Sequence, residues 1–150
     1  MDIFEVYISE NKCNPECRAL TCKSYGEVYK KEKHCEIDLQ KTNYELATYG
    51  DVLLKFSLCS LLLDSCEQLS EKKKKYETDK FLIETVAQHY RLLDYMNFDK
   101  SDKKILQEYR YHKKKTKYIA TTVEAVLGAI YQQNKDLEEI FKLVDSWRIL

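Results

Sequence analysis

The segment ELATYGDVLL, residues 45–54, places the acidic residue Asp51 in a run that, after Glu45, is otherwise typical of a buried helix. A second segment, TTVEAVLGAIY at residues 121–131, does the same with Glu124. Carboxylates are rarely buried unless they are paired, hydrogen-bonded or bound to a metal. Because strong core residues follow each acid, the pattern predicts two helices that converge on a cation. The two segments therefore indicate a metal-dependent enzyme.

The composition predicts a single all-α domain over residues 1–150. Apolar residues make up 44% of the chain, which is enough for a core, and one Pro and three Gly are too few for a turn-dense β fold. Leu, Lys, Glu and Ala recur at helical spacing. The chain shows no repeats and no linker that would mark a second domain.

The polar and apolar pattern predicts a series of helices and their caps. Helices are expected near residues 1–10, 15–25, 43–66, 70–76, 79–93, 99–109, 118–132 and 136–150. The expected N-terminal caps are Asn14, Ser70, Asp79 and either Asp99 or Ser101, and Asn134 is the expected C-terminal cap. The helix over 43–66 is apolar around most of its surface, which predicts a place in the centre of a bundle.

Charge is unevenly distributed along the chain. The formal net charge of zero argues against binding of nucleic acid by bulk charge alone, but local patches still bind phosphates. For the run Lys72–Lys75, a solvated helix face is the favoured interpretation. For residues 110–117, contact with phosphates is weighed against a solvated loop. The basic residues of this second run are Arg110, Lys113, Lys114, Lys115 and Lys117.

The N-terminus MDIFE lacks the basic start and apolar run of a signal peptide, and the apolar stretch 56–63 is too short to cross a bilayer. We therefore expect a cytoplasmic protein with no membrane partner, whose six cysteines are free thiols. The alternative is a zinc site built from Cys13, Cys17, Cys22 and Cys35. Their spacing lacks the paired C-x2-C knuckles of common structural zinc sites.

Three blocks of the sequence resemble the catalytic domain of ribonuclease III. Residues 19–25, ALTCKSY, resemble the family block A-L-T-H-x-S-Y, and residues 46–54 resemble its signature L-E-F-L-G-D-x-x-L. Residues 123–131, VEAVLGAIY, resemble E-A-x-I-G-A-I-Y. Between them, Leu69-Ser70 and residues 78–82 follow the order of the family's L-S…V-S-N-x-x-L stretch. The resemblance covers residues 17–147.

The resemblance implies a helical bundle that acts as a homodimer and cuts double-stranded RNA with Mg²⁺, for which Mn²⁺ is expected to substitute. By position, Asp51 and Glu124 match the family's acids, so both are implied as catalytic residues and metal ligands. Mg²⁺ prefers hard oxygen ligands and keeps several waters. It activates a water and stabilises charge on the leaving oxygen, which leaves 5′-phosphate and 3′-hydroxyl ends in this family. The basic run 110–117 matches a basic stretch beside the active-site valley, which implies contacts with RNA phosphates.

The chain departs from the usual set of four acids. Alanine and threonine, Ala47 and Thr121, replace two of them, and Tyr44 replaces an acid seven residues before Asp51. Glu45 does not compensate, because it lies about 240° around the helix from Asp51. The Mini-III branch of the family, which is active and lacks an RNA-binding domain, has alanine and threonine at the same two places. Thr121 is a candidate outer residue of the metal site.

The sequence hypothesis is a Mg²⁺-dependent endoribonuclease for double-stranded or structured RNA. Because no RNA-binding domain is expected after Leu150, affinity for naked duplex should be modest. Specificity would then come from a ribosomal or RNA-binding partner protein, or from a folded substrate such as a ribosomal RNA precursor. The alternative is a catalytically inactive member of the family that binds RNA or serves as a ribosome-associated structural protein.

Overall fold

The computed structural model describes residues 1–25, 41–64, 68–99 and 109–150, and helices dominate them. The elements are α1 (Ile3–Glu10), η1 (Arg18–Leu20), α3 (Tyr44–Leu62), α4 (Leu69–Glu77), α5 (Asp79–Phe81), η3 (Leu82–Ala87), α6 (Gln88–Tyr90), η4 (Leu92–Asp94), α7 (Lys117–Asn134) and α8 (Leu137–Trp147). Here η1 and η4 are 3-10 helices and η3 is a π-helix. No strand occurs in these residues, and the only β pairing described is a bridge between Thr21 and Asn97. The predicted all-α fold is confirmed.

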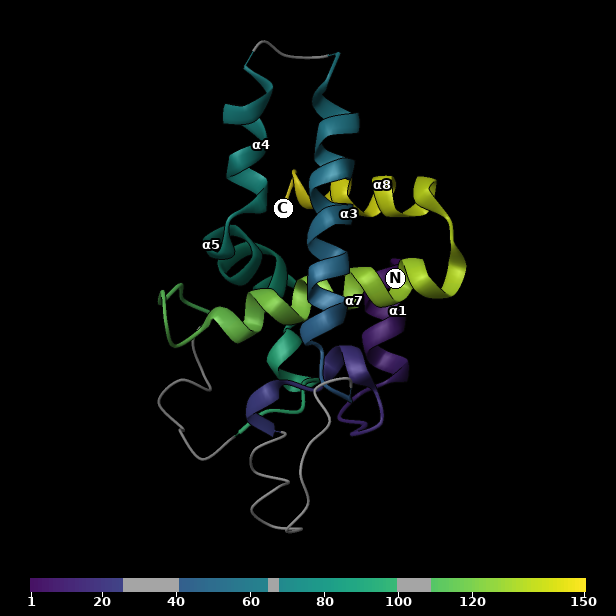
Figure 1. The fold of residues 1–150 in the computed structure, drawn as a ribbon, viewed down its shortest axis with the longest axis vertical. Coiled ribbons are helices and arrows are strands. Elements are labelled where there is room, and N and C mark those ends of the chain that lie inside the picture. The colour runs from purple at the N-terminus through teal and green to yellow at the C-terminus, as the bar shows by residue number, and fades with distance from the viewer. Residues whose placement is uncertain (26–40, 65–67, 100–108) are drawn as a thin grey trace.

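Helices α3 and α7 form the centre of the molecule, where they cross at a steep angle (Figure 1). The face of α3 that meets α7 is apolar and includes Leu46, Leu53, Leu54 and Leu58, all buried. Gly128 of α7 and Gly50 of α3 allow the close approach, because a Cβ atom on either would collide with the backbone of the other helix. The prediction that the helix over residues 43–66 lies in the centre of a bundle is therefore confirmed.

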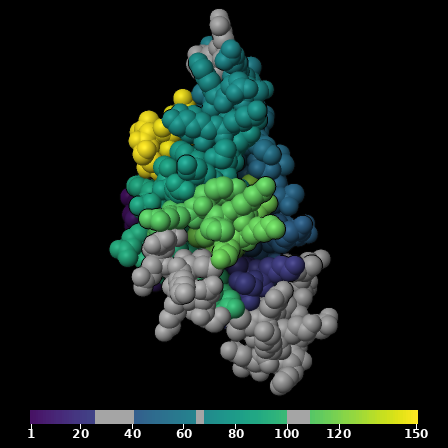
Figure 2. All heavy atoms as spheres, turned by 90° about the vertical axis from the view of Figure 1, so that its left-hand side faces the viewer, coloured from purple at the N-terminus to yellow at the C-terminus, as the bar shows by residue number. Residues whose placement is uncertain are grey.

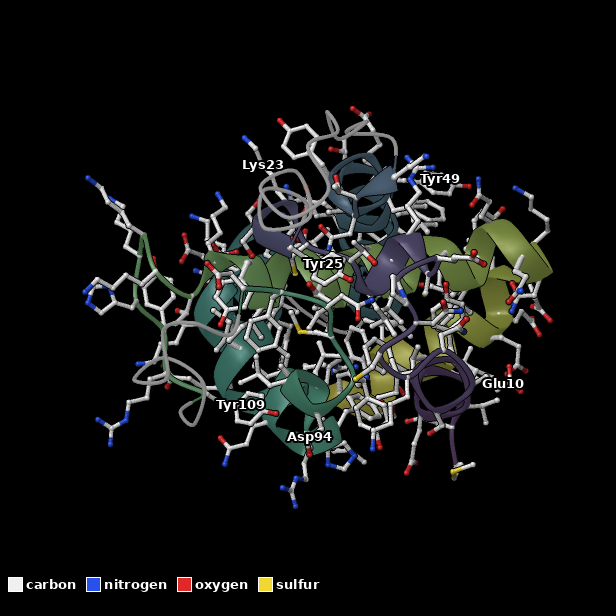
Figure 3. The ribbon with its side chains drawn as sticks, turned by 90° about the horizontal axis from the view of Figure 1, so that it is seen from below. Glu10, Lys23, Tyr25, Tyr49, Asp94 and Tyr109 are labelled. Atoms are coloured by element: carbon white, nitrogen blue, oxygen red, sulfur yellow. The ribbon has the colours of Figure 1, made fainter. Side chains whose placement is uncertain are left out.

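The remaining helices pack around this crossing. Helix α8 and helix α1 complete the core, where Trp147 donates a hydrogen bond of 2.9 Å to the Tyr90 hydroxyl and Phe4 stacks on the Tyr90 ring. Helix α4 runs alongside α3 in the opposite direction and carries no fully buried residue (Figure 1). The segment that begins at Tyr109 contacts η4, because the Tyr109 hydroxyl accepts a hydrogen bond from the Leu93 amide. Tyr109 lies beside Asp94 in Figure 3.

The predicted helix over residues 15–25 is wrong in its first part. Asn14 accepts a bond from the Glu16 amide and closes a turn, and only the three residues of η1 are helical before Thr21. The backbone then pairs with a distant segment: the Asn97 amide donates to Leu20 and the Cys22 amide donates to Asn97, at 2.8 and 2.9 Å. These long-range bonds satisfy amide and carbonyl groups that a local helix would otherwise satisfy.

The expected caps also need correction. Helix α4 starts one residue before Ser70 and follows Gln68, which has a left-handed backbone with φ of 62°. Thr78, rather than Asp79, caps α5, since its hydroxyl accepts the Phe81 amide at 3.2 Å. The single helix expected over 79–93 is a succession of α5, the π-helix η3 and α6.

At the C-terminal end, two helices are confirmed with shifted ends. Helix α7 ends at Asn134, and Lys135 is the left-handed residue that follows it, with φ of 54°. Asn134 instead accepts the Asp136 amide, and Asp136 caps α8 through the Glu139 amide. The helix expected over 99–109 lies almost wholly outside the described residues. In the parts of the chain that the structure describes, no helix is long and apolar enough to span a membrane.

Candidate active site

Two glycines set the position of the two acids. A Cβ atom on Gly50 would stand 1.7 Å from the Glu124 carbonyl oxygen, and one on Gly128 would stand 2.6 Å from the Leu46 carbonyl oxygen. No side chain fits at such distances, so α3 and α7 touch through backbone here. Because Asp51 directly follows Gly50, this contact brings its side chain to Glu124. The predicted convergence of two helices that carry Asp51 and Glu124 is observed.

The two carboxyl groups share a hydrogen bond, in which a protonated Glu124 donates to the Asp51 carboxylate. Burial raises the pKa of Glu124 to about 9, and the hydrogen bond and negative charge of Asp51 add to this rise. Partial burial acts to raise the pKa of Asp51 too, but hydrogen bonds from Glu124 and Lys55 outweigh burial and lower it. The two acids therefore hold one proton between them at neutral pH.

Lysines from two helices face this pair. The Lys55 ammonium, one turn after Asp51 on α3, lies 2.9 Å from the Asp51 Oδ2 atom. Lys73 of α4 also acts on Asp51 through its charge, and it is paired with both oxygens of Glu77 at 3.1 Å. The Lys73 side chain is only 21% exposed, so the interpretation of Lys72–Lys75 as a solvated face is wrong for this lysine. Asp79 of α5 adds negative charge near Glu124.

Sequence reasoning missed these neighbours for different reasons. Lys55 follows Asp51 by four residues, so the helical spacing alone could have placed it beside the acid. Lys73, Glu77 and Asp79 lie on other elements, and only the packing of α4 and α5 against the crossing brings them near. Nothing in their local sequence distinguishes them from solvated charges.

The donor chemistry fits a magnesium ion. Two carboxylates lie close enough to share one proton, which a divalent cation would replace, and Mg²⁺ completes its shell with water. Groups of three or more acidic, histidine or cysteine side chains arranged for a metal do not occur among the described residues. Asp51 and Glu124 supply the two carboxylates of this pair, whose oxygens are the kind of ligand that Mg²⁺ prefers.

The positions at which this chain lacks the family's acids lie where helical geometry predicts. Ala47, one turn before Asp51, is buried and supplies no ligand, and Glu45 is exposed away from the site. Thr121 donates its hydroxyl to the Lys117 carbonyl at 3.1 Å, and no contact places it against Asp51. Its proposed part in the metal site thus stays a prediction.

The basic run forms an exposed turn at the start of α7. The Thr116 hydroxyl accepts the His112 amide at 2.8 Å and closes the turn, while the Tyr111 amide donates to Glu84 at 2.9 Å. Glu124 lies seven positions after Lys117 in the helix, which is about 10 Å along the axis. In Figure 2 this segment lies on the same face as α4. The five basic residues of the run are all exposed: Arg110, Lys113, Lys114, Lys115 and Lys117.

The cysteines do not gather into a metal centre among the described residues. Cys13 is exposed and donates to the Asp94 carbonyl, whereas Cys17 lies near the Tyr7 hydroxyl. Cys22 is buried in a polar cluster with Asn43 and Thr122, in which the Asn43 amide donates to the Thr122 hydroxyl at 2.9 Å. Cys35, the fourth ligand of the zinc alternative, lies outside the described residues.

A comparison with known protein families matches residues 45–135 to the family described as Ribonuclease III domain. This range begins in the first turn of α3 and ends just after α7, so it holds both acids and the crossing. A comparison with curated proteins gives no match. Members of the family are endoribonucleases that act on double-stranded RNA and generally depend on a divalent metal. The match covers more than half of the chain, and it follows that this protein belongs to the ribonuclease III domain family.

Proposed function

We propose that this protein is a Mg²⁺-dependent endoribonuclease that cleaves double-stranded or structured RNA at the Asp51–Glu124 pair. The observation that carries the proposal is the backbone contact of α3 and α7 at Gly50, which brings the buried Glu124 and Asp51 close enough to raise the pKa of Glu124 to about 9. Burial of an acid whose pKa is about 9 does not stabilise the fold at a pH that ionises the acid. Groups with pKa values shifted in this way cluster at functional sites. Mn²⁺ is proposed to substitute for Mg²⁺.

Each residue of the site has a definite part in this proposal. Asp51 stays ionised and provides the first carboxylate ligand, and Glu124 provides the second once its proton leaves. When bound, Mg²⁺ would supply an activated water and would neutralise charge at the leaving phosphate oxygen. The backbone contact at Gly50 fixes the two carboxyl groups relative to each other, so little rearrangement is needed. The proposed products carry 5′-phosphate and 3′-hydroxyl ends.

We propose a homodimer formed through the outer face of α3. Val52 and Phe56 are 62% and 50% exposed, and they continue an apolar stripe that includes Tyr49 and Leu63. The Phe56 ring lies 5.8 Å from that of Phe141 on α8, and Tyr49 lies 6.0 Å from Tyr131 on α7, so aromatic side chains widen the stripe. Contiguous apolar surface of this kind marks protein contacts.

The exposed lysines of the 112–116 turn are proposed to bind RNA phosphates. They precede α7, whose first residue lies about 10 Å along the helix axis from Glu124, and this arrangement suits one duplex that spans both. Since the net charge is zero, this local patch has to supply the attraction. A folded substrate such as a ribosomal RNA precursor, or a ribosomal or RNA-binding partner protein, is proposed to add specificity, in a cytoplasmic setting.

One observation favours a second function. Only Asp51 and Glu124 remain of four usual acids, which suits an inactive member that binds RNA or serves as a ribosome-associated structural protein. The same replacements, Ala47 and Thr121, suit the active Mini-III branch, to which we assign the chain. The intact acid pair favours the enzyme, because burial of an acid next to Asp51 brings no benefit to a purely structural protein.

Metal dependence separates the two functions. The purified protein is mixed with an RNA duplex of mixed sequence, with Mg²⁺ or with EDTA, and the products are resolved on a denaturing gel. We expect cleavage with Mg²⁺ alone, and a loss of at least about 100-fold in Asp51→Asn and Glu124→Gln, as when a key stabilising group is removed.

Glu45→Gln is the matched control, because Glu45 is an exposed acid on the same helix as Asp51. This variant should cleave at the wild-type rate. Duplex binding without cleavage, over several metals and substrates, would support the inactive RNA-binding protein instead.

A further inference from the structure

A lysine places a positive charge at the outer end of the candidate active site, directly beside the acid pair. Along one face of α3, the successive residues are Ala47, Asp51 and Lys55, one helical turn apart. Ala47 is buried and apolar, whereas the Lys55 side chain is 50% exposed and its ammonium lies 2.9 Å from Asp51. The site therefore has an ammonium within reach of solvent and of one catalytic carboxylate.

Lys55 is held mainly by one anion. Its hydrogen bond and ion pair with Asp51 raise its pKa most, and Glu77 of α4 and Glu124 of α7 act on it more weakly. Glu77 already pairs with Lys73 at 3.1 Å, and Glu124 shares its proton with Asp51. If Asp51 binds a cation, Lys55 consequently loses its main partner.

We propose that Lys55 is a phosphate-binding residue of the active site, which neutralises Asp51 in the absence of metal and contacts the RNA phosphate when Asp51 binds a divalent cation. The inference rests on the proposed function and names a further residue for it. The long side chain of Lys55 needs only to rotate, because the side chain is half-exposed and its stem starts one turn from Asp51.

The charges around the site support this exchange. Two carboxylates and one Mg²⁺ are together neutral, so the phosphodiester and the charge that develops on it need a further cation. Lys55 is the exposed ammonium that directly contacts the acid pair among the described residues, whereas Lys73 is mostly buried against Glu77. An ammonium that is already in place stabilises developing charge without reorganisation.

The proposal predicts opposite effects on metal binding and on cleavage. In Lys55→Met, Mn²⁺ should bind up to about tenfold more tightly in isothermal titration without RNA, since no ammonium competes for Asp51 and neighbours of ligands change affinity by such factors. Single-turnover cleavage at saturating Mg²⁺ should fall by at least about tenfold, as it does when other charge-stabilising groups are removed. Lys55→Arg should retain more cleavage than Lys55→Met.

Lys142→Met is the matched control, because Lys142 pairs with Glu139 at 3.5 Å on the surface of α8. It should change neither readout. Unchanged or weaker Mn²⁺ binding in Lys55→Met, or cleavage at the wild-type rate, would overturn the proposal. A parallel loss of metal binding, cleavage and thermal stability would show that Lys55 only holds Asp51 in place, which also overturns it.

The design separates failure of this inference from failure of the proposed function. If the wild-type protein does not cleave any duplex, the proposed function fails, and Lys55 is then judged by the gain in duplex affinity that Mn²⁺ produces. That gain should be present in the wild type and in Lys142→Met and absent in Lys55→Met. An equal gain in all three proteins overturns the role of Lys55.

Discussion

Helix α3 has two apolar faces with different consequences. The inner face packs on α7 so closely that backbone touches backbone at Gly50, and no exposed surface remains there. The outer face bears Val52, which is 62% exposed, and Phe56, which is 50% exposed. The inner face fixes the geometry of the acid pair, whereas the outer face leaves apolar surface for a partner. The same residue types thus position the acids on one side and would mediate association on the other side in the proposed homodimer.

The inner face gives the largest expected effect. In Gly50→Ala, the new methyl group meets the Glu124 carbonyl carbon and oxygen at 2.5 and 1.7 Å, so the helices have to separate. We expect the free energy of unfolding to fall by about 3 kcal/mol or more. This change lowers the melting temperature by about 6–12 °C in a domain of this size. Differential scanning calorimetry measures the shift.

Thr48→Ala is the control, since Thr48 is exposed on the same helix. It should melt within about 2 °C of the wild type, as surface substitutions do. A Gly50→Ala variant as stable as this control would contradict the close approach of the two helices.

The acid pair gives the next effect, through pH. The pKa of Glu124 rises from 4.5 in the unfolded chain to about 9 in the fold, so the folded state holds the proton more tightly. The resulting stability is fully present below pH 4.5 and is lost as the pH rises towards 9. Glu124→Gln removes this loss, and in EDTA at pH 8 it should be more stable than wild type by about 1–3 kcal/mol.

Urea unfolding at several pH values measures the difference. It should shrink towards zero as the pH falls to 4.5, and Mg²⁺ should narrow it at pH 8 by stabilising only the wild type. A difference that is independent of pH would show that Glu124 is not protonated in the fold.

The outer face of α3 tests the comparison from its other side. Val52→Glu combined with Phe56→Glu should convert the proposed dimer to monomers, with a dissociation constant at least about tenfold higher, since charges would replace apolar anchors. Sedimentation velocity measures this change. Tyr111→Glu is the control, because Tyr111 is an exposed aromatic residue away from α3. A wild-type protein that is monomeric at all concentrations would remove the proposed role of this face.

The smallest effect is expected at the basic turn. Alanine at Lys113, Lys114 and Lys115 should weaken duplex binding and reduce the salt slope by about 0.7–0.9 for each RNA phosphate that these lysines neutralise. Binding is measured by fluorescence anisotropy over a range of salt concentrations, with Lys142→Ala as control. An unchanged slope would exclude this turn from the RNA site without affecting the acid pair.

The sequence predicted the parts of the molecule that depend on local pattern. Long apolar runs identified α3 and α7, and an acid within each run identified Asp51 and Glu124, because burial makes such residues exceptional. The prediction of a helix over residues 15–25 failed, because backbone pairing of Thr21 and Cys22 with Asn97 overrides the local helical pattern. Lys73 was misjudged for a related reason: its burial depends on how α4 packs near α3, which local sequence does not encode.

The polar cluster of Cys22, Asn43 and Thr122 offers a way to observe local opening of the fold. Burial raises the pKa of the Cys22 thiol to about 11, and its sulfur lies within hydrogen-bond distance of Thr122 on α7 and Asn43 at the start of α3. A thiol in this state resists alkylation, because the thiolate is the reactive form. Cys13 is exposed and reacts without any opening. Labelling of Cys22 therefore reports how often the cluster that joins it to Thr122 and Asn43 opens, and a bound metal or RNA that stabilises the fold should slow this labelling.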